Sequence, residues 1–429
     1  MIADRYGKEY CLMKKYDLVV VGGGLSGVAA SVSAAREGLS VLLVEKSGSL
    51  GGAISNNLVY PFMRYWTLDN DNKVGYHLSG GIFEEMRERE KKFTSEFSLM
   101  RFKPEYFKFL LDDMVSEAGV ELLFHSTLFD VKSEGSKIKS VGITTASGVI
   151  YFEADFFIDT TGDGNLFALA GCDYQLGRES DGLCQPMTTC FRMSGVDVAQ
   201  FKKDSAMINE KYKELQKNGE IKNPREDILV FYGIGEGIVH FNTTRIVKLD
   251  PTNPFDKSRA EIEARRQVYE MELFLKKHSK AFENSTLISI ASEIGVRESR
   301  KLKGVYVLTV EDLKNLTYFD DAIALGNYDI DIHNPAGSGT SHYYFKGEDK
   351  YSIPYRSLLP KEYDNLLVAG RCISATHEAQ ASVRIMPICT TLGQAAGTAA
   401  AVAFKSGKSA HTVDVKALRE TLIKNGAVL

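Results

Sequence analysis

The feature that most constrains the fold is a glycine-rich turn between a buried strand and a helix near the N-terminus. Residues 18–21 are an unbroken aliphatic run, which suits a parallel strand buried on both faces. Gly22, Gly24 and Gly27 follow in the spacing G-x-G-x-x-G. Glycines at this spacing give a tight turn, let the backbone approach a pyrophosphate and let the next helix pack closely on the sheet. The stretch therefore predicts a βαβ unit that binds a dinucleotide.

A second strand and an acidic residue complete the unit. The helix after the turn is rich in Ala, Ser and Val and is predicted to end at Gly38, a natural residue for a helix C-terminus. Residues 39–44 form the next strand, and Glu45 stands at its end, 18 residues beyond Gly27. A carboxylate there can accept hydrogen bonds from both ribose hydroxyls and would repel a 2′-phosphate. The candidates are therefore FAD and NAD, and the alternative is a βαβ unit that binds no nucleotide.

Further motifs follow along the chain. They are Glu45-Lys46, Gly51-Gly52, Asp159-Thr-Thr-Gly-Asp-Gly164, Ile294-Gly-Val-Arg-Glu-Ser-Arg300, Asp331-Ile-His-Asn-Pro335, Ile353-Pro-Tyr-Arg-Ser357 and Asn365-Leu-Leu-Val-Ala-Gly-Arg371. With these motifs the chain resembles the bacterial FAD-dependent oxidoreductase family often called FAD_oxidored, among the glutathione-reductase-like flavoproteins of the succinate dehydrogenase and fumarate reductase type. The resemblance covers residues 15–404 and implies both the fold and FAD as the cofactor. It does not identify the substrate.

The resemblance also indicates where FAD is held. It implies backbone contacts with the pyrophosphate and ribityl chain at Gly51 and Gly52, and with adenine at Leu128. Asp163 is interpreted either as a cofactor residue or as a cap for the helix that begins at Asn165. The predicted cofactor-binding residues are Gly22, Gly24, Leu25, Ser26, Gly27, Glu45, Lys46, Gly51, Gly52, Leu128, Thr161, Gly162, Asp163, Gly370, Arg371 and Leu392. The sequence has no clear flavinylation motif, so we expect FAD to be bound without a covalent bond.

The predicted fold class is α/β, with a Rossmann-like FAD-binding domain and an inserted α+β substrate or cap domain. The FAD-binding domain comprises residues 14–175 and 350–429, and its parallel sheet carries a β-meander over residues 129–152. The cap domain comprises residues 176–349, with antiparallel strands in 228–244 and an amphipathic helix over 260–277. Residues 233–237 imitate a dinucleotide turn but lead into a strand, which predicts a hairpin. A helix that starts near Pro387 is rich in small residues and is expected to face the flavin.

Composition narrows the function by exclusion. The chain has 429 residues, 44% of them hydrophobic, and a net charge of −4 without a basic block, so two domains and no nucleic-acid partner are expected. None of the six cysteines forms a C-x-x-C pair, and no metal is predicted. No apolar run has the length of a membrane span, and the sequence predicts a cytoplasmic protein without a membrane partner. Met13 looks like the natural start.

Cationic and imidazole side chains are the candidates for catalysis, because a flavin accepts the hydride and the protein has to orient the donor. Arg297 and Arg300 are three residues apart and are predicted to share a helical face, where they would clamp a carboxylate or hydroxyls. Glu298 makes a structural ion-pair network the alternative. His333 and His377 are candidate general bases, with a structural role as the alternative for each.

These observations predict an FAD-dependent oxidoreductase that transfers a hydride between a small polar metabolite and non-covalently bound FAD. The metabolite is expected to be a small-molecule substrate, and the electron acceptor is expected to be separate and is not identified. The alternatives are a non-redox or nucleic-acid-modifying flavoprotein and an NAD-binding dehydrogenase. The sequence does not determine the oligomeric state.

Overall fold

A seven-stranded sheet forms the centre of the computed structural model, which describes residues 2–3, 9–10, 12–94 and 96–429. Its strands lie in the order β7-β4-β3-β10-β9-β8, with β21 also paired to β10. The bounds are β3 Leu12–Val21, β4 Val41–Val44, β7 Glu121–Leu123, β8 Thr127–Glu134, β9 Lys137–Thr145, β10 Gly148–Asp159 and β21 Leu366–Val368. The strands β7, β4, β3, β10 and β21 run parallel to one another. Strand β9 pairs antiparallel with β10, and β8 pairs antiparallel with β9. This arrangement confirms the predicted Rossmann-like fold with a β-meander.

Strand β10 belongs to both parts of this sheet. Residues 151–159 pair parallel with β3 on one side. On the other side, residues 148–153 pair antiparallel with β9 and residues 157–159 pair parallel with β21. The twelve residues therefore form one continuous strand that exchanges β9 for β21 along one edge.

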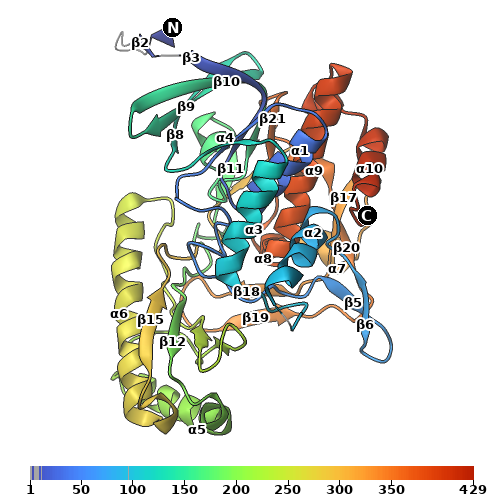
Figure 1. Ribbon diagram of the computed structural model, residues 1–429. Helices are drawn as coiled ribbons and strands as arrows, with labels where there is room; N and C mark the ends of the chain where they lie inside the picture. Colours follow the sequence, from blue (N-terminus) through green and yellow to red (C-terminus); the bar gives the residue numbers. More distant parts are fainter. Residues whose placement is uncertain (1, 4–8, 11, 95) are drawn as a thin grey trace.

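Helices pack on the central sheet and on one another. The bounds are α1 Leu25–Arg36, α2 Ile82–Glu90, α3 Pro104–Glu117, α4 Asn165–Leu169, α9 Met386–Ser406 and α10 Val415–Lys424. Helix α1 ends just before Gly38, which has φ +93°, as the sequence predicted. Helix α3 begins at its proline and is followed by Gly119 at φ +75°. Helices α1 and α9 lie side by side although one is near the start of the chain and the other near its end (Figure 1).

The contact between α1 and α9 is made by backbone atoms. A Cβ atom added at Gly393 would stand 2.1 Å from the carbonyl oxygen of Ser26, and one added at Gly397 would stand 2.1 Å from that of Ala30. The Ser26 hydroxyl donates a hydrogen bond to the carbonyl oxygen of Cys389 at 2.8 Å. Small residues therefore allow the two helices to approach until their backbones touch.

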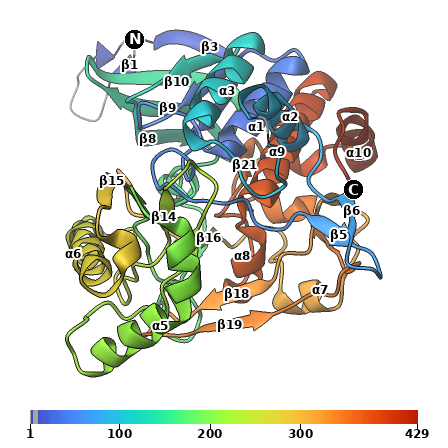
Figure 2. The ribbon, with the colours of Figure 1, turned by 60° about the horizontal axis from the view of Figure 1, so that its bottom comes forward.

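A separate antiparallel sheet, which we call the cap sheet, has the strand order β13-β14-β12-β15. Its bounds are β12 Phe191–Ser194, β13 Val230–Phe231, β14 Val239–Phe241 and β15 Thr286–Ile290, and its helices are α5 Val198–Lys217 and α6 Pro254–His278. Phe191 and Phe241 stack with ring centroids 4.5 Å apart in the apolar core shared with these helices. Figure 2 shows α6 on the side of the cap sheet away from α8. Residues 233–237 join β13 to β14, which confirms the predicted hairpin.

Short strand pairs and helices connect the two sheets. They are β5 Trp66–Leu68 with β6 Val74–His77, β11 Tyr174–Leu176 with β16 Arg300–Leu302, β17 Ala322–Gly326 with β20 Tyr351–Pro354, β18 Ile330–His333 with β19 Thr340–Tyr343, and the helices α7 Val310–Lys314 and α8 His377–Val383. Leu308, Ile323 and Ile330 belong to the same apolar cluster as residues of α1 and α9. The domain boundaries at 175/176 and 349/350 stay a prediction.

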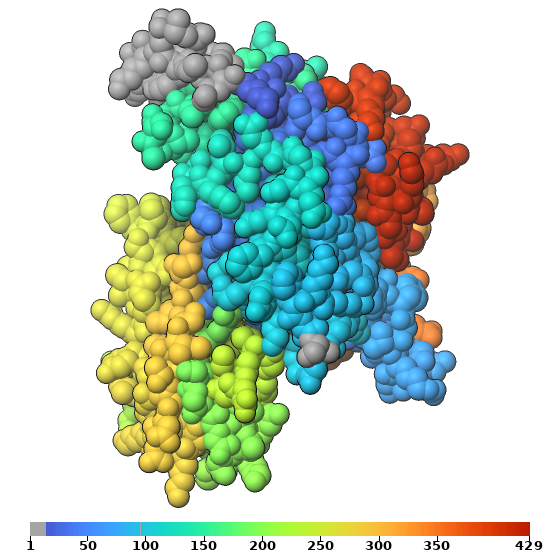
Figure 3. Space-filling model, in the orientation of Figure 1, coloured from blue at the N-terminus to red at the C-terminus, as the bar shows by residue number. Residues whose placement is uncertain are grey.

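The segment that carries α2 and α3 joins the central sheet to the cap sheet. In the space-filling view this segment, coloured light blue to cyan, fills the middle of one face and meets the green part of the chain below it (Figure 3). The Lys103 ammonium group donates to the carbonyl oxygen of Ile234 at 2.9 Å, in the hairpin between β13 and β14. The hairpin is thus held against the FAD-binding part of the chain.

Within the described ranges, no single helix is long and apolar enough to cross a membrane. Helices α8 and α9 meet that test of length and composition only when taken together, and they are bent by 94° at the break between them.

The contact between α1 and α9 predicts the effect of adding one methyl group. Gly393→Ala should lower the free energy of unfolding by about 1–3 kcal/mol, because the new Cβ has to push two backbones apart. The matched control is Gly337→Ala, where no atom lies within 4 Å of the added Cβ. Denaturant titration of both variants measures the difference, and equal stabilities would contradict the close contact.

Candidate active site

The parallel strands of the central sheet end at one edge, where ligands bind in open α/β sheets. The segments that follow β3, β4, β10 and β21 all carry predicted cofactor residues. In chain order these residues are Gly22, Gly24, Glu45, Thr161, Gly162, Asp163, Gly370 and Arg371. The fold therefore brings together four of the segments that the sequence analysis assigned to the cofactor.

The three glycines of the first turn have different roles. Gly22 has φ +108°, and a Cβ there would stand 2.6 Å from the carbonyl oxygen of Thr160. A Cβ on Gly27 would stand 1.8 Å from the carbonyl oxygen of Gly22. A Cβ on Gly24, in contrast, would meet no described atom within 4 Å. Gly24 also precedes α1, whose first N–H groups receive no side-chain cap. The turn therefore offers open space and free donors, which fit a pyrophosphate.

Glu45 is 5% exposed and takes part in the glycine turn itself. One of its carboxylate oxygens accepts from the Gly23 N–H at 2.6 Å, and the other accepts from the Ser47 N–H at 2.8 Å. Each carboxylate oxygen can accept a further hydrogen bond. The carboxylate is thus positioned for ribose hydroxyls, and it also fixes the turn, a role that the sequence analysis did not foresee.

Two acidic residues at and after the end of β10, Asp159 and Asp163, have different roles. Asp159 accepts from the backbone N–H groups of Leu166 and Phe167, so Asp159 caps α4. Asp163 instead accepts from the Ser299 hydroxyl at 2.8 Å and the Arg371 guanidinium at 2.9 Å. Burial opposes ionisation of Asp163, but Arg371 and nearby groups lower its pKa to about 2. The interpretation of Asp163 as a helix cap was therefore wrong.

The other predicted cofactor residues line or support the same edge. Gly51 donates its N–H to Gly23 at 2.9 Å, and a Cβ on Gly52 would stand 3.1 Å from the Gly24 Cα. Lys46 forms an ion pair with Glu293 at 2.6 Å. The remaining positions are Leu25, Ser26 and Leu392, which are buried in α1 and α9, and Leu128, which is partly buried on β8.

Arg297 is a partly buried cation that forms no hydrogen bond or ion pair with a carboxylate among the described residues. Its guanidinium donates to the Pro186 carbonyl oxygen at 2.7 Å, to the Thr188 hydroxyl, and to the Asn242 side-chain oxygen at 3.3 Å. Burial, followed by the charges of neighbouring arginines, lowers the pKa of Arg297 to about 9. The charge of Asp331 acts in the opposite direction but does not restore the ordinary pKa, which favours a further anion beside Arg297.

Arg300 does not accompany Arg297, which corrects the prediction that the two share a helical face. Arg297 lies in an irregular segment, and Arg300 is the first residue of strand β16. Arg300 donates to the carbonyl oxygen of Asp163 at 3.1 Å and lies over the ring of Tyr174. A spacing of three does not place two side chains on one side of an extended chain, because successive side chains alternate.

His333 and Asp331 lie in the same polar group as Arg297. The Nδ1 atom of His333 is 3.3 Å from the Arg245 guanidinium, which can only donate, so Nδ1 accepts and the proton is on Nε2. That Nε2 is 3.4 Å from the Asp331 carboxylate. Burial, followed by the charge of Arg297, lowers the pKa of His333 to about 3. His333 is therefore a neutral imidazole that orients Asp331.

Asp331 has an oxygen available for a ligand. One carboxylate oxygen lies near His333, near the Tyr328 hydroxyl at 3.1 Å and near Arg384 at 3.6 Å. The other oxygen is buried and lies 3.7 Å from Nδ1 of His342, beyond hydrogen-bond distance, so it has no hydrogen-bond partner among the described residues. Burial alone would raise the pKa of Asp331. His333 and the arginines have the larger, opposite effect and hold the pKa below its ordinary value, so the carboxyl is ionised.

His377 belongs to a different buried group. Its Nδ1 lies 2.8 Å from Glu298, which also forms an ion pair with Lys301 and accepts from the Gln185 N–H. The structure thus brings together Arg297 and His333 but directs Arg300 and His377 to other partners. The ion-pair network expected around Glu298 is present, and it involves Lys301 rather than Arg297.

Sequence reasoning did not assign a role to Asp331, Arg245, Arg192 or His240. Arg192 and His240 are buried, and they face each other on β12 and β14 of the cap sheet. A useful signal was the alternation of polar and apolar residues in each short strand. It marks one face of each strand, but it does not show which strands pair.

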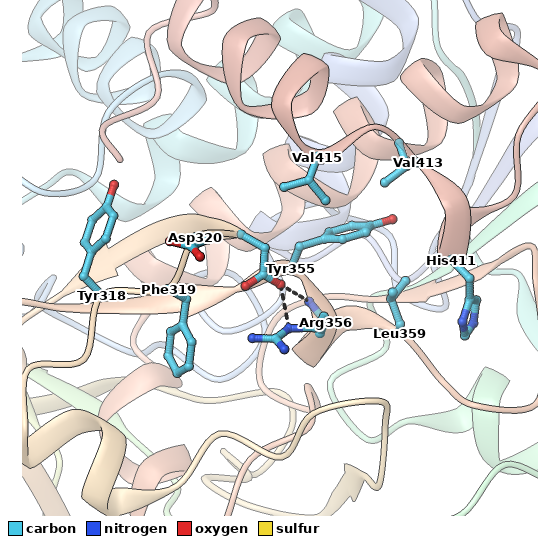
Figure 4. Close-up of a pocket in the computed structure, with 10 residues that line it drawn as sticks. Tyr318, Phe319, Asp320, Tyr355, Arg356, Leu359, His411, Val413 and Val415 are labelled. Carbon is cyan, nitrogen blue, oxygen red and sulfur yellow. Dashed lines mark hydrogen bonds and ion pairs between the residues drawn. The ribbon is translucent and has the colours of Figure 1, made fainter.

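A pocket of about 550 Å³ lies apart from these groups (Figure 4). It is lined by residues such as Tyr318, Tyr355 and His411, and it contains the ion pair between Arg356 and Asp321. None of the predicted site residues lines it. Among the described residues, no group of three or more His, Cys, Asp or Glu side chains is arranged to hold a metal ion.

Comparison with known proteins identifies the family. The profile of the family named FAD dependent oxidoreductase matches residues 17–422, nearly the whole chain. The protein therefore belongs to this family of flavin enzymes. Its cofactor is FAD, and the glycine turn, Glu45 and the open space at Gly24 fit that cofactor.

Similar proteins match over limited segments. Protein FixC of Azorhizobium caulinodans is 29% identical over 175 residues, which cover 36% of this chain and 38% of that protein. NADH:fumarate oxidoreductase of Klebsiella pneumoniae is 56% identical over 51 residues, 12% of this chain and 6% of that protein. The chain thus matches well under half of the length of these relatives. The structure of p-nitrophenol 4-monooxygenase PnpA from Pseudomonas putida shares the fold, with a TM-score of 0.50 and 9% identity over 96% of this chain and 85% of that one.

The double role of Glu45 predicts two effects of one substitution. Glu45→Ala removes an acceptor for ribose and leaves the buried N–H group of Gly23 and the partly buried N–H group of Ser47 without this partner. Loss of one or two such hydrogen bonds costs about 1–3 kcal/mol, so FAD affinity should fall about ten- to a hundredfold. The flavin-to-protein absorbance ratio and the melting temperature of the FAD-free protein measure the two effects. Glu45→Gln, which keeps one carbonyl acceptor, should be milder, and normal FAD retention in Glu45→Ala would contradict the assignment.

The buried neutral histidines predict a pH dependence of stability. Burial lowers the pKa of His240 and His333 to about 3, whereas both side chains take up protons near pH 6.5 in the unfolded chain. The free energy of unfolding should therefore decrease on acidification below pH 6.5, by up to about 1.4 kcal/mol per pH unit for each histidine. Denaturant titrations between about pH 7 and pH 5 measure this slope. His240→Gln should reduce it, and a stability that rises on acidification would contradict it.

Proposed function

We propose that this enzyme oxidises or reduces a small polar metabolite that carries a negative charge, by hydride transfer with FAD, and that it passes electrons to a separate acceptor. The observation that carries the proposal is the partly buried Arg297, whose hydrogen-bond partners among the described residues are all neutral. Removing a cation from water is costly unless an opposite charge approaches it. A substrate anion would supply that charge when it binds.

The planar guanidinium of Arg297 is suited to orient such an anion. A guanidinium offers donors in a rigid fork that matches a carboxylate, and a lysine does not reproduce this geometry. The charge of Arg384 also acts on Arg297 and lies 3.6 Å from Asp331. The charges of both arginines therefore act on the single carboxylate of Asp331.

The second contact of the substrate is assigned to the unpartnered oxygen of Asp331. This oxygen can accept a hydrogen bond from a hydroxyl or amine on the reacting carbon, while His333 holds the other oxygen in place. When a hydride leaves that carbon, the proton of its hydroxyl or amine leaves as well. Asp331 is the group assigned to accept the hydrogen bond from that hydroxyl or amine. His333 acts through Asp331 and is therefore a positioning residue.

FAD, when bound, supplies the two-electron acceptor or donor of this reaction. The residues proposed to hold it are the glycines of the first turn, Glu45, Asp163 and Arg371 at the carboxyl edge of the central sheet. The N-terminus of α9 has no side-chain cap, so its N–H groups favour negative charge there. The sequence has no C-x-x-C dithiol to pass electrons onward, which supports a separate acceptor.

The first test asks which compound reduces the flavin. The purified FAD-loaded enzyme should lose its yellow absorbance anaerobically with small hydroxy or amino acids. Arg297→Lys should slow that reduction strongly and keep FAD bound, because the charge stays and the fork is lost. Arg259→Lys, at an exposed residue of α6 paired with Asp256, is the matched control and should react normally.

Two results would contradict this function. If Arg297→Ala gives an unstable protein with a normal rate per bound flavin, Arg297 has a structural role only. If the flavin is reduced by NADH or NADPH and by none of the metabolites, the hydride comes from a nicotinamide. Melting temperature, flavin spectrum and reduction rate, measured on the same preparations, separate these cases.

A further inference from the structure

The inner face of the cap sheet carries a cation and an imidazole side by side. Arg192 on β12 and His240 on β14 are cross-strand partners, so their side chains leave the sheet on the same face. Their neighbours Phe191 and Phe241 point to the opposite face, into the core beneath α5 and α6. Arg192 and His240 therefore point toward the FAD-binding part of the chain.

Both side chains are buried without the hydrogen bonds that burial normally demands. Arg192 is 6% exposed and His240 is 0% exposed. Within the described part of the chain, the Nε and Nη2 atoms of Arg192 and both ring nitrogens of His240 have no hydrogen-bond partner. A buried polar group without a partner costs free energy, and a charged one costs most. An ordinary apolar core does not contain two such groups at directly opposed positions of neighbouring strands.

The position of the free atoms on Arg192 selects the kind of ligand. Nε and Nη2 form one edge of the guanidinium, with two parallel N–H donors that match the two oxygens of a carboxylate. The third nitrogen, Nη1, lies 3.7 Å from Glu105, whose side chain is 63% exposed. Glu105 compensates the charge only weakly, because solvent screens it. The paired edge of Arg192 stays available.

Aromatic side chains border this pair. The ring of Tyr60 lies 5.5 Å from that of His240, and the ring of Phe231 lies 6.3 Å from it. Burial and the charge of Arg192 lower the pKa of His240 to about 3, so His240 is neutral and can donate one hydrogen bond and accept another. The surroundings suit a carboxylate attached to an apolar group.

The pair is also a neighbour of the Arg297 group along the chain. Asn242, which accepts a hydrogen bond from Arg297, directly follows β14 and is two residues beyond His240. Cys190, two residues before Arg192, feels the charges of both Arg297 and Arg192. Two residues along a strand span about 7 Å, which is within the length of a small metabolite.

We infer that Arg192 and His240 form a carboxylate-binding subsite on the cap sheet, which holds the end of the substrate remote from the reacting carbon. This inference rests on the proposed function for the identity of the ligand as substrate. The existence of the subsite does not depend on turnover. The substrate class that follows is a small metabolite that carries, besides the anionic group assigned to Arg297, a second carboxylate next to an apolar part.

The test is carboxylate binding to the oxidised, FAD-loaded protein. Acetate and benzoate are titrated by calorimetry at constant ionic strength, with chloride as the reference anion. Saturable binding of at least one of them is expected. Arg192→Gln should weaken it by at least about tenfold, since charge-assisted hydrogen bonds are lost, and Arg192→Lys should give an intermediate loss. Glu105→Gln should bind as tightly or more tightly, because it removes a competing anion.

The controls locate the anion and separate this inference from the proposed function. Arg297→Lys should keep carboxylate affinity if the subsite is at Arg192. Absence of saturable binding, unchanged affinity in Arg192→Gln, or loss of binding only in Arg297→Lys would overturn the subsite. If Arg192→Gln fails to fold, the comparison of Arg192→Lys with Glu105→Gln gives the same decision. Protein that binds carboxylates but is not reduced by any metabolite rejects the reaction and keeps the subsite.

Discussion

The direct contact of α1 with α9 is the constraint on which the cofactor edge depends. Gly393 and Gly397 let the second helix lie on the backbone of the first, and Ser26 ties its hydroxyl to the first turn of α9. Because contacts run from Ser26 to Gly393 and from Ala30 to Gly397, the helices point the same way. Their N-termini therefore meet at one end of the sheet, where two helix dipoles add a positive field suited to an anionic cofactor.

The two faces of the cap sheet differ in how well their side chains are stabilised by the rest of the chain. One face is ordinary apolar core, with stacked phenylalanines beneath two helices. The other face holds Arg192, His240 and the partners of Arg297, and their charges and donors are poorly compensated by the chain itself. Natural sequences depart from the rules of polar satisfaction mainly at functional sites. The anion proposed to bind here would resolve the departure on this face.

The sequence predicted what depends on near neighbours in the chain. The glycine turn, the end of α1 before Gly38 and the hairpin at 233–237 follow from residues a few positions apart, and the structure has all three. Prediction from the sequence failed where the pairing of distant strands decides which side chains lie together. Arg192 faces His240 only because β12 pairs with β14. The spacing of Arg297 and Arg300 was correctly noted but assigned to a helix, and an irregular segment leading into a strand sends the two side chains apart.

The shared strand β10 has a consequence for how the protein folds during synthesis. Its parallel half lies between β3 and β21, and Phe157 pairs with Leu366, about 200 residues later in the chain. Closing so long a loop is slow, because its entropy cost comes before the contacts form. The first 160 residues therefore emerge with one edge of β10 and one side of α1 uncovered. Helix α9 is synthesised late in the chain, and only α10 follows it as an α-helix. The cofactor edge of the central sheet is therefore completed only when α9 packs against α1.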